Sequence, residues 1–132
     1  MEETSIHTKI HALIIDDEFD IFYLLKEILK GRDIQTTHVG TLAEARHALQ
    51  TVTPSLILLD NHLPDGTGID FIKYIRDTCP ETKVIVFTGD DTLSNINKAR
   101  KEGAVEFIGK PFSIQKVYAT IDKIIKVDAV PK

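Results

Sequence analysis

The sequence has 132 residues, of which 42% are apolar and 27% are charged, as expected for one globular domain with a single core. Its formal net charge of −4 gives no support for nucleic-acid binding, because a phosphate-binding surface needs a basic excess. No apolar run is long enough to span a bilayer, the start is polar and unlike a signal peptide, and the single Cys79 cannot form an internal disulfide. We therefore expect a cytoplasmic protein without a membrane segment.

Short apolar runs alternate five times with amphipathic segments along the chain. The expected strands are Lys9–Ile15, Ile34–Val39, Leu56–Leu59, Lys83–Phe87 and Val105–Ile108. The expected helices are Phe19–Lys30, Leu42–Gln50, Gly68–Asp77, Thr92–Glu102 and Ser113–Val127. Residues 9–127 are thus expected to form one domain, with an N-terminal tail at 1–8 and a C-terminal tail or the start of a linker at 128–132.

Apolar residues at helical spacing predict which helix faces are buried. They are Phe22, Leu25, Ile28 and Leu29 in the first helix, Ile69, Ile72 and Ile75 in the third, and Ile114, Val117, Ile121, Ile124 and Ile125 in the fifth. Thr41 and Glu44 form a capping-box pattern at the start of the second helix, and Thr67 is expected to cap the third. These signals fix where several helices should begin.

The strands read as continuous apolar runs, which is typical of a parallel sheet covered by helices on both faces. Short connections between alternating strands and helices imply right-handed crossovers. The expected fold is a doubly wound, flavodoxin-like α/β domain with a five-stranded parallel sheet in the order 2-1-3-4-5. In this fold ligands bind outside the carboxyl ends of the strands.

Polar residues stand at four of these strand ends: Asp16 with Asp17, then Asp60, Thr88 and Lys110. Strands one and three would be neighbours, so the three carboxylates should share a small space. Two charges about 5 Å apart repel by roughly 3 kcal/mol at an effective dielectric near 20, and a hard cation such as Mg²⁺ would relieve this. The plainer alternative is that Asp17 and Asp20 only begin a helix, where negative charge suits the dipole.

Asp60 is a candidate nucleophile, because a carboxylate can attack a phosphoryl group and form an aspartyl phosphate. Lys110 would offset charge on the phosphoryl oxygens, Thr88 could donate its hydroxyl to one of them, and Gly89 leaves room for the backbone. Taken singly, Thr88 could be an ordinary strand-end residue and Lys110 an ordinary exposed lysine. The turn-rich loop after Asp60 could supply a backbone carbonyl to the metal, whereas the histidines, His62 included, lack zinc-type spacing.

Four segments in order, IIDDE, LILLDNHLPDGTG, VIVFTG and FIGKPF, resemble the receiver domain of bacterial two-component response regulators, the CheY-like superfamily. The resemblance extends from about Lys9 to Ile125. It implies that Asp60 is the phosphoacceptor and that Asp16 and Asp17 bind Mg²⁺ together with Asp60 and the backbone carbonyl of His62. Leu63 and Gly89 are the minor departures from the usual family residues.

The resemblance also assigns roles to the remaining strand-end residues. Thr88 matches the switch hydroxyl, Lys110 the phosphate-contacting lysine and Phe107 the switch aromatic residue three positions before that lysine. His62 and Asp90 lie two residues beyond Asp60 and Thr88, where the family modulates the lifetime of the phosphoryl group.

In this family the phosphoryl donor is a sensor histidine kinase or phosphotransfer protein, and the signal passes to an output domain or a docking protein. The resemblance implies that the face formed by 92–102, 105–108 and 113–127 carries the signal and can form a homodimer. The domain would act as a phosphorelay switch, with only self-catalysed phosphotransfer and slow autodephosphorylation, and without contacting nucleic acid or membrane. No effector segment follows the last helix, so the domain either acts by docking or belongs to a longer chain.

Two other interpretations use the same residues. A phosphatase of the haloacid dehalogenase type also forms an aspartyl phosphate, but it needs an Asp-x-Asp pair and usually a cap insertion, whereas Asp16 and Asp17 are adjacent. A pseudo-receiver that only binds a partner would be expected to lack Asp60 or Lys110, and both are present.

Overall fold

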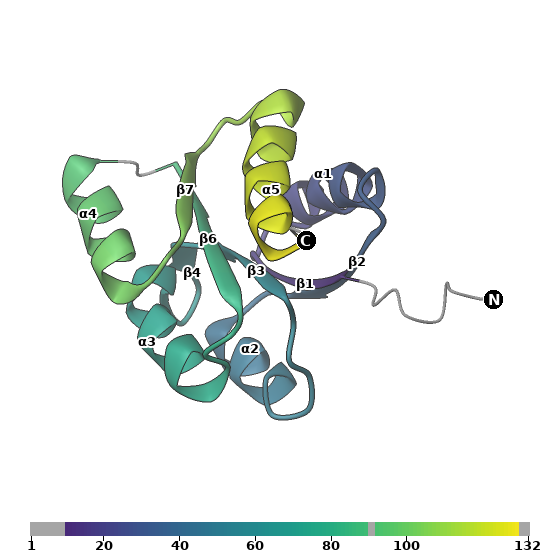
Figure 1. Cartoon of the computed structure of the whole chain (residues 1–132). Helices are drawn as coiled ribbons and strands as arrows, with labels where there is room; N and C mark the ends of the chain where they lie inside the picture. Colours follow the sequence, from purple (N-terminus) through teal and green to yellow (C-terminus); the bar gives the residue numbers. More distant parts are fainter. Residues whose placement is uncertain (1–9, 90–91, 130–132) are drawn as a thin grey trace.

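The computed structural model describes residues 10–89 and 92–129 and contains a central five-stranded parallel sheet in the order β2-β1-β3-β6-β7 (Figure 1). Its strands are β1 (Ile10–Ile15), β2 (Ile34–Val39), β3 (Leu56–Asp60), β6 (Lys83–Thr88) and β7 (Glu106–Gly109). The helices are α1 (Phe19–Lys30), α2 (Leu42–Ala48), α3 (Gly68–Thr78), α4 (Leu93–Glu102) and α5 (Ile114–Ala129). Counting only the strands of this sheet, its order is the predicted 2-1-3-4-5, so the expected fold class is confirmed.

Helices cover both faces of the sheet (Figure 1). One apolar cluster joins the sheet to α1 and α5 through buried side chains such as Leu25, Leu29, Val117 and Ile121. The other cluster joins the opposite face to α2, α3 and α4. Because both faces are covered, all five residues of β3 are buried, which explains why this strand reads as an uninterrupted apolar run before Asp60.

A short antiparallel hairpin, β4 (His62–Leu63) and β5 (Gly66–Thr67), lies in the segment that we expected to be an irregular loop. The hairpin pairs His62 with Thr67 and Leu63 with Gly66. Gly66 has φ = 152°, a backbone conformation that side-chain-bearing residues rarely adopt. The hairpin leads directly into α3 and so connects the end of β3 to that helix.

The predicted helix starts are partly confirmed. The Thr41 hydroxyl accepts from the N–H of Glu44 at 3.0 Å, while the Glu44 carboxylate accepts from Gly40, one residue before the usual capping-box partner. Thr67 makes no side-chain cap, which corrects our expectation, because its hydroxyl donates to Asp70 at 2.8 Å instead. The first turn of α3 is held by Asn61, whose side chain accepts from the N–H of Ile69.

Several predicted burial assignments also need correction. Ile114 is 51% exposed because α5 begins there, beyond the carboxyl edge of the sheet, while Val117, Ile121 and Ile124 are buried as expected. Phe22 is only half-buried. Val105 precedes β7 and is 40% exposed. The expected tail at 1–8 and the candidate residue Asp90 lie outside the described residues.

Within the described ranges, no helix has the length and apolarity needed to cross a membrane.

Candidate functional site

The candidate site lies at the carboxyl edge of the sheet, where the four neighbouring strands β1, β3, β6 and β7 end. Asp60 is the last residue of β3 and Thr88 the last residue of β6, while Asp16 follows β1 and Lys110 follows β7. The parallel register aligns Ile15 with Leu59, so the carboxylates of Asp16 and Asp60 emerge side by side. The sheet thus brings together residues that are up to 94 positions apart in the sequence.

The three predicted carboxylates converge. Asp16, Asp17 and Asp60 each place a carboxylate oxygen within 4.8 Å of the other two. Asp16 is 2% exposed and Asp60 is 5% exposed, whereas Asp17 is open to solvent. At such separations each pair of unit charges repels by roughly 3 kcal/mol at an effective dielectric near 20, so the cluster favours a cation among its oxygens.

Lys110 supplies part of that positive charge. Its ammonium Nζ donates to Asp16 Oδ2 at 3.1 Å and lies 3.5 Å from Asp60 Oδ1 and 3.7 Å from Glu18 Oε1. The side chain is only 17% exposed, so it is not the ordinary surface lysine of the plainer interpretation. Burial by itself lowers the pKa of Lys110, but the attraction of Asp16 and Asp60 outweighs burial, and the pKa is raised.

The pKa of Asp60 is raised above its ordinary value. Burial is the largest cause, because it penalises the charged carboxylate, and the nearby charge of Asp16 acts in the same direction. Lys110 and the N–H of His62, 3.4 Å from Asp60 Oδ1, lower the pKa but do not compensate fully. An added cation would favour the ionised, nucleophilic form of Asp60.

The two adjacent acids differ in the hydrogen bonds that their carboxylates accept from the described residues. Asp16 Oδ1 accepts from the N–H of Glu18 at 2.8 Å, and Oδ2 accepts from Lys110. Among the described residues, none donates a hydrogen bond to the Asp17 carboxylate. The donor set offered to a cation consists of carboxylate oxygens, which suits a hard divalent ion and gives no support for zinc.

The remaining predicted residues surround this cluster. Thr88 is completely buried, and its carbonyl accepts from the N–H of Lys110 at 2.8 Å. Phe107 on β7 is half-buried and packs against the apolar cluster on the α3 and α4 side of the sheet. His62 is exposed at the start of the hairpin. A Cβ atom at Gly89 would meet no atom within 4 Å, so the protein itself does not require glycine there.

Four residues outside the predicted set also shape the site. Glu18 contributes a third acid near Lys110, Asn61 and Gly68 fix the backbone beside Asp60, and His38 bonds the backbone of Asp16. Two of them have a signal in the sequence: Glu18 continues the acidic run that begins at Asp16, and Gly68 follows the turn-rich segment after Asp60. No local pattern pointed to His38, because its partner is 22 residues away.

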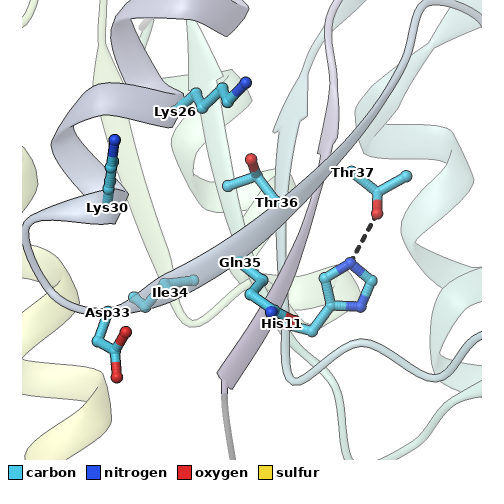
Figure 2. Close-up of a pocket in the computed structure, with 8 residues that line it drawn as sticks. All are labelled: His11, Lys26, Lys30, Asp33, Ile34, Gln35, Thr36 and Thr37. Carbon is cyan, nitrogen blue, oxygen red and sulfur yellow. Dashed lines mark hydrogen bonds between the residues drawn. The ribbon is translucent and has the colours of Figure 1, made fainter.

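A separate hollow of about 510 Å³ lies along the edge strand β2 and contains none of these carboxylates (Figure 2). Lys26 and Lys30 line it from α1, and His11 lines it from β1. His11 Nε2 and the hydroxyl of Thr37 are 2.7 Å apart there.

The fold and the site together define a class of protein, and comparison with known proteins agrees. The profile of the response regulator receiver domain matches residues 12–122, and the chain belongs to this family. The chain is 37% identical over 106 residues to the response regulator protein PilR of Pseudomonas aeruginosa, covering 80% of this chain and 24% of PilR. It is 32% identical over 114 residues to the DNA-binding transcriptional regulator NtrC of Klebsiella pneumoniae, covering 86% of this chain and 24% of NtrC.

The chain therefore spans about a quarter of the length of these two relatives. Among solved structures it resembles the beryllofluoride-activated NtrC4 receiver domain dimer, with a TM-score of 0.84 and 35% identity, covering 89% of this chain and 97% of that one. A CheY-like receiver domain protein from Methanospirillum hungatei JF-1 gives a TM-score of 0.85 at 25% identity, covering 91% and 96%. The chain is thus a receiver domain of two-component phosphorelay signalling.

Proposed function

We propose that this domain is a switch in which Asp60 accepts a phosphoryl group from the phosphohistidine of a sensor kinase or phosphotransfer protein. The observation that supports this most strongly is the ammonium of Lys110 lying within 3.5 Å of two buried carboxylates, Asp16 and Asp60. Two buried acids without a nearby positive charge would destabilise the fold, and Lys110 supplies that charge. The same ammonium would stabilise the negative charge of a phosphoryl group at this site.

In the transfer, a carboxylate oxygen of Asp60 attacks phosphorus, an O–P bond forms, and the P–N bond to the donor histidine breaks with its electrons leaving on the imidazole. The ammonium of Lys110 would stabilise the negative charge on the phosphoryl oxygens, because it already lies close to both Asp16 and Asp60. Thr88, at the end of the neighbouring strand, would donate its hydroxyl to one of those oxygens.

Asp16, Asp17 and Asp60 would hold Mg²⁺, together with the carbonyl of His62. Their oxygen-only donor set fits a hard cation. When bound, Mg²⁺ supplies positive charge that offsets the crowded carboxylates and the incoming phosphoryl oxygens. The protein's own contribution is to hold the three acids together at the end of two adjacent strands.

A donor protein would approach over the start of α1. Phe19 and Tyr23 are 60% and 54% exposed there, and Phe19 directly follows Glu18, which faces Lys110. An exposed aromatic pair beside a reactive carboxylate suits recognition of a partner protein. The signal would leave through α4, β7 and α5 to an output domain, a docking protein or a second copy of the domain. The cytoplasmic location expected from the sequence stays a prediction.

The domain would act as a phosphoacceptor and not as a phosphatase with a diffusible substrate. The phosphoryl lifetime would depend on His62 and Asp90. The chain spans only a quarter of PilR and NtrC, so any further activity of a complete protein would reside in segments that accompany this domain.

Phosphorylation can be tested with acetyl phosphate and Mg²⁺, followed by intact-mass measurement. The parent should gain one phosphoryl group, and Asp60→Ala should gain none. Asp77→Ala, which removes an exposed carboxylate on α3, is the matched control and should label like the parent. Labelling of Asp60→Ala at the parental level would show that the phosphoacceptor is another residue.

A further inference from the structure

His38 on β2 makes a side-chain contact with the backbone of the acidic pair. Its ring stacks on Phe22 of α1 with centroids 4.3 Å apart and 10° between the ring planes, and a second ring, Phe19, lies 5.6 Å away. Stacking leaves Nε2 at 2.7 Å from the carbonyl oxygen of Asp16. A carbonyl oxygen can only accept, so His38 must carry its hydrogen on Nε2.

Two adjacent residues of β2 therefore hold both backbone groups of Asp16. The carbonyl of Val39 accepts from the Asp16 N–H at 3.1 Å, and His38 donates to the Asp16 carbonyl. That carbonyl belongs to the peptide that joins Asp16 to Asp17. Because a peptide is planar, fixing its oxygen also fixes the direction in which the chain continues to Asp17.

The side chains of Asp16 and Asp17 differ in how the protein holds them. Its side chain is exposed, and no described residue donates to its carboxylate, so its own contacts do not orient it. Asp16, in contrast, is held at its side chain by Lys110 and Glu18. Of the two acids, Asp17 is the one whose position must be set through the main chain.

We propose that His38 is a positioning residue for the cation site: its Nε2–H fixes the Asp16–Asp17 peptide and thereby presents the Asp17 carboxylate beside Asp60. This inference rests on the proposed binding of Mg²⁺. His38 is not itself a ligand, because its Nε2 is used as a donor and the ligand cluster of the described residues consists of Asp16, Asp17 and Asp60. Partners that orient ligands in this way typically change metal affinity about tenfold or more when removed.

Two substitutions separate the donor from the stacked ring. His38→Phe keeps an aromatic ring against Phe22 but removes the donor, whereas His38→Gln removes the ring but can place an amide N–H near the position of Nε2. His11→Phe is the matched control, because His11 bonds the hydroxyl of Thr37 (Figure 2) and lies near the start of β1, whereas Asp16 follows the end of that strand. Mg²⁺ affinity is measured for each intact protein by calorimetry and by the amide shifts of Asp17.

We expect His38→Phe to weaken Mg²⁺ binding about tenfold, with His38→Gln and His11→Phe staying within about twofold of the parent. Parental affinity in His38→Phe, or an equal loss in His38→Gln, would overturn the positioning role. The ring nitrogen spectrum of the parent adds a test that needs no metal, since it should show the Nε2–H tautomer, and the Nδ1–H tautomer would overturn the inference even if His38→Phe failed to fold. A parent that binds no Mg²⁺ would overturn the proposed cation site and this inference with it.

Discussion

Gly68, the first residue of α3, packs directly against the backbone of Asp60. A Cβ atom on Gly68 would overlap the carbonyl oxygen of Asp60 and lie 2.8 Å from the side chain of Leu59. Asn61 joins the same two segments, because its carbonyl and side-chain oxygens accept from the N–H groups of Gly68 and Ile69 at 2.8 and 2.9 Å. The position of Asp60 is therefore set by the start of α3 as well as by the end of β3.

Gly68→Ala should destabilise the protein by about 2 kcal/mol, because the added methyl group must displace the main chain of a buried strand. Urea unfolding measures the change in the free energy of unfolding. Gly89→Ala is the control, since a Cβ there meets nothing within 4 Å, and it should change stability by less than about 0.5 kcal/mol. Equal effects of the two substitutions would contradict the close packing at Gly68.

Asp60→Asn should stabilise the metal-free protein at neutral pH by about 1 kcal/mol, because it removes a buried charge from a cluster of acids. The pKa of Asp60 is raised, chiefly by burial. A carboxyl group whose pKa is raised in the folded state stabilises that state at pH values below its ordinary pKa of about 4. This contribution to the free energy of unfolding is lost as the pH rises through the raised pKa.

The advantage of Asp60→Asn over the parent should therefore grow as pH rises from about 4 toward neutrality. Urea unfolding at a series of pH values without divalent ions measures it. An advantage that stays constant across this range would show that charge on Asp60 is not its cause.

Asp65 connects the loop after the hairpin strand β4 to α2. Its carboxylate accepts from the N–H groups of Leu42 at 2.9 Å and Ala43 at 3.0 Å, and these bonds lower its pKa. A lowered carboxyl pKa contributes stability that is present above the ordinary value and is lost as pH falls through the lowered pKa.

Asp65→Asn should thus lower the melting temperature at neutral pH, and its difference from the parent should narrow below about pH 4. Thermal unfolding followed by circular dichroism measures both. Asp77→Asn, at an exposed carboxylate paired with Lys73, should change the melting temperature less. If the melting temperature of Asp65→Asn stays equally far below that of the parent at low pH, the charge on the Asp65 carboxylate is not the cause of the stabilisation.

Mg²⁺ binding should depend on Asp17 more than on Asp16. Both oxygens of Asp16 are engaged by Glu18 and Lys110, whereas the Asp17 carboxylate is open to solvent. We expect Asp17→Asn to weaken Mg²⁺ at least about tenfold and Asp16→Asn to weaken it less. Calorimetric titration compares the two, and parental affinity in Asp17→Asn would refute the assignment.

The signal should leave through α4, β7 and α5. Thr88 ends β6 and pairs with Gly109 of β7, whereas Phe107 lies two residues earlier on β7, pairs with Val86 and is only half-buried. We expect a phosphoryl group to draw the Thr88 hydroxyl toward Asp60 and so vacate space that the Phe107 ring can enter, which provides two alternative packings. Phenylalanine lacks the hydroxyl that would favour an outward ring, so the free protein should already sample the inward position.

Amide shifts with and without beryllofluoride measure this change. The expected perturbation extends from the carboxylates to α4 and β7, and Phe107→Ala should reduce it at α4 while leaving it intact near Asp60. Perturbations confined to the segments around Asp17 and Asp60 would exclude this route for the signal.

The sequence alone determined the five strands of the parallel sheet, their order and the identity of the clustered acids, but not the hairpin of β4 and β5. Apolar runs such as those before Asp16 and Asp60 are buried on both faces. The hydrophobic effect is non-directional and depends on the apolar area buried, so such a run can be recognised without knowing which side chains it will contact. Parallel pairing then brings successive strand ends to one edge, so the convergence of Asp16, Asp60 and Lys110 followed from topology.

Only the tertiary structure decided how these residues are held. Lys110 hydrogen-bonds Asp16, Asn61 rather than Thr67 holds the start of α3, and His38 bonds the Asp16 carbonyl. Each of these choices depends on angstrom-scale distances between polar atoms on different elements, and hydrogen bonds weaken steeply with small changes in geometry. Sequence periodicity describes which face of an element is buried, but it carries no such distances, and so the supporting contacts of the site emerge only once the elements are packed.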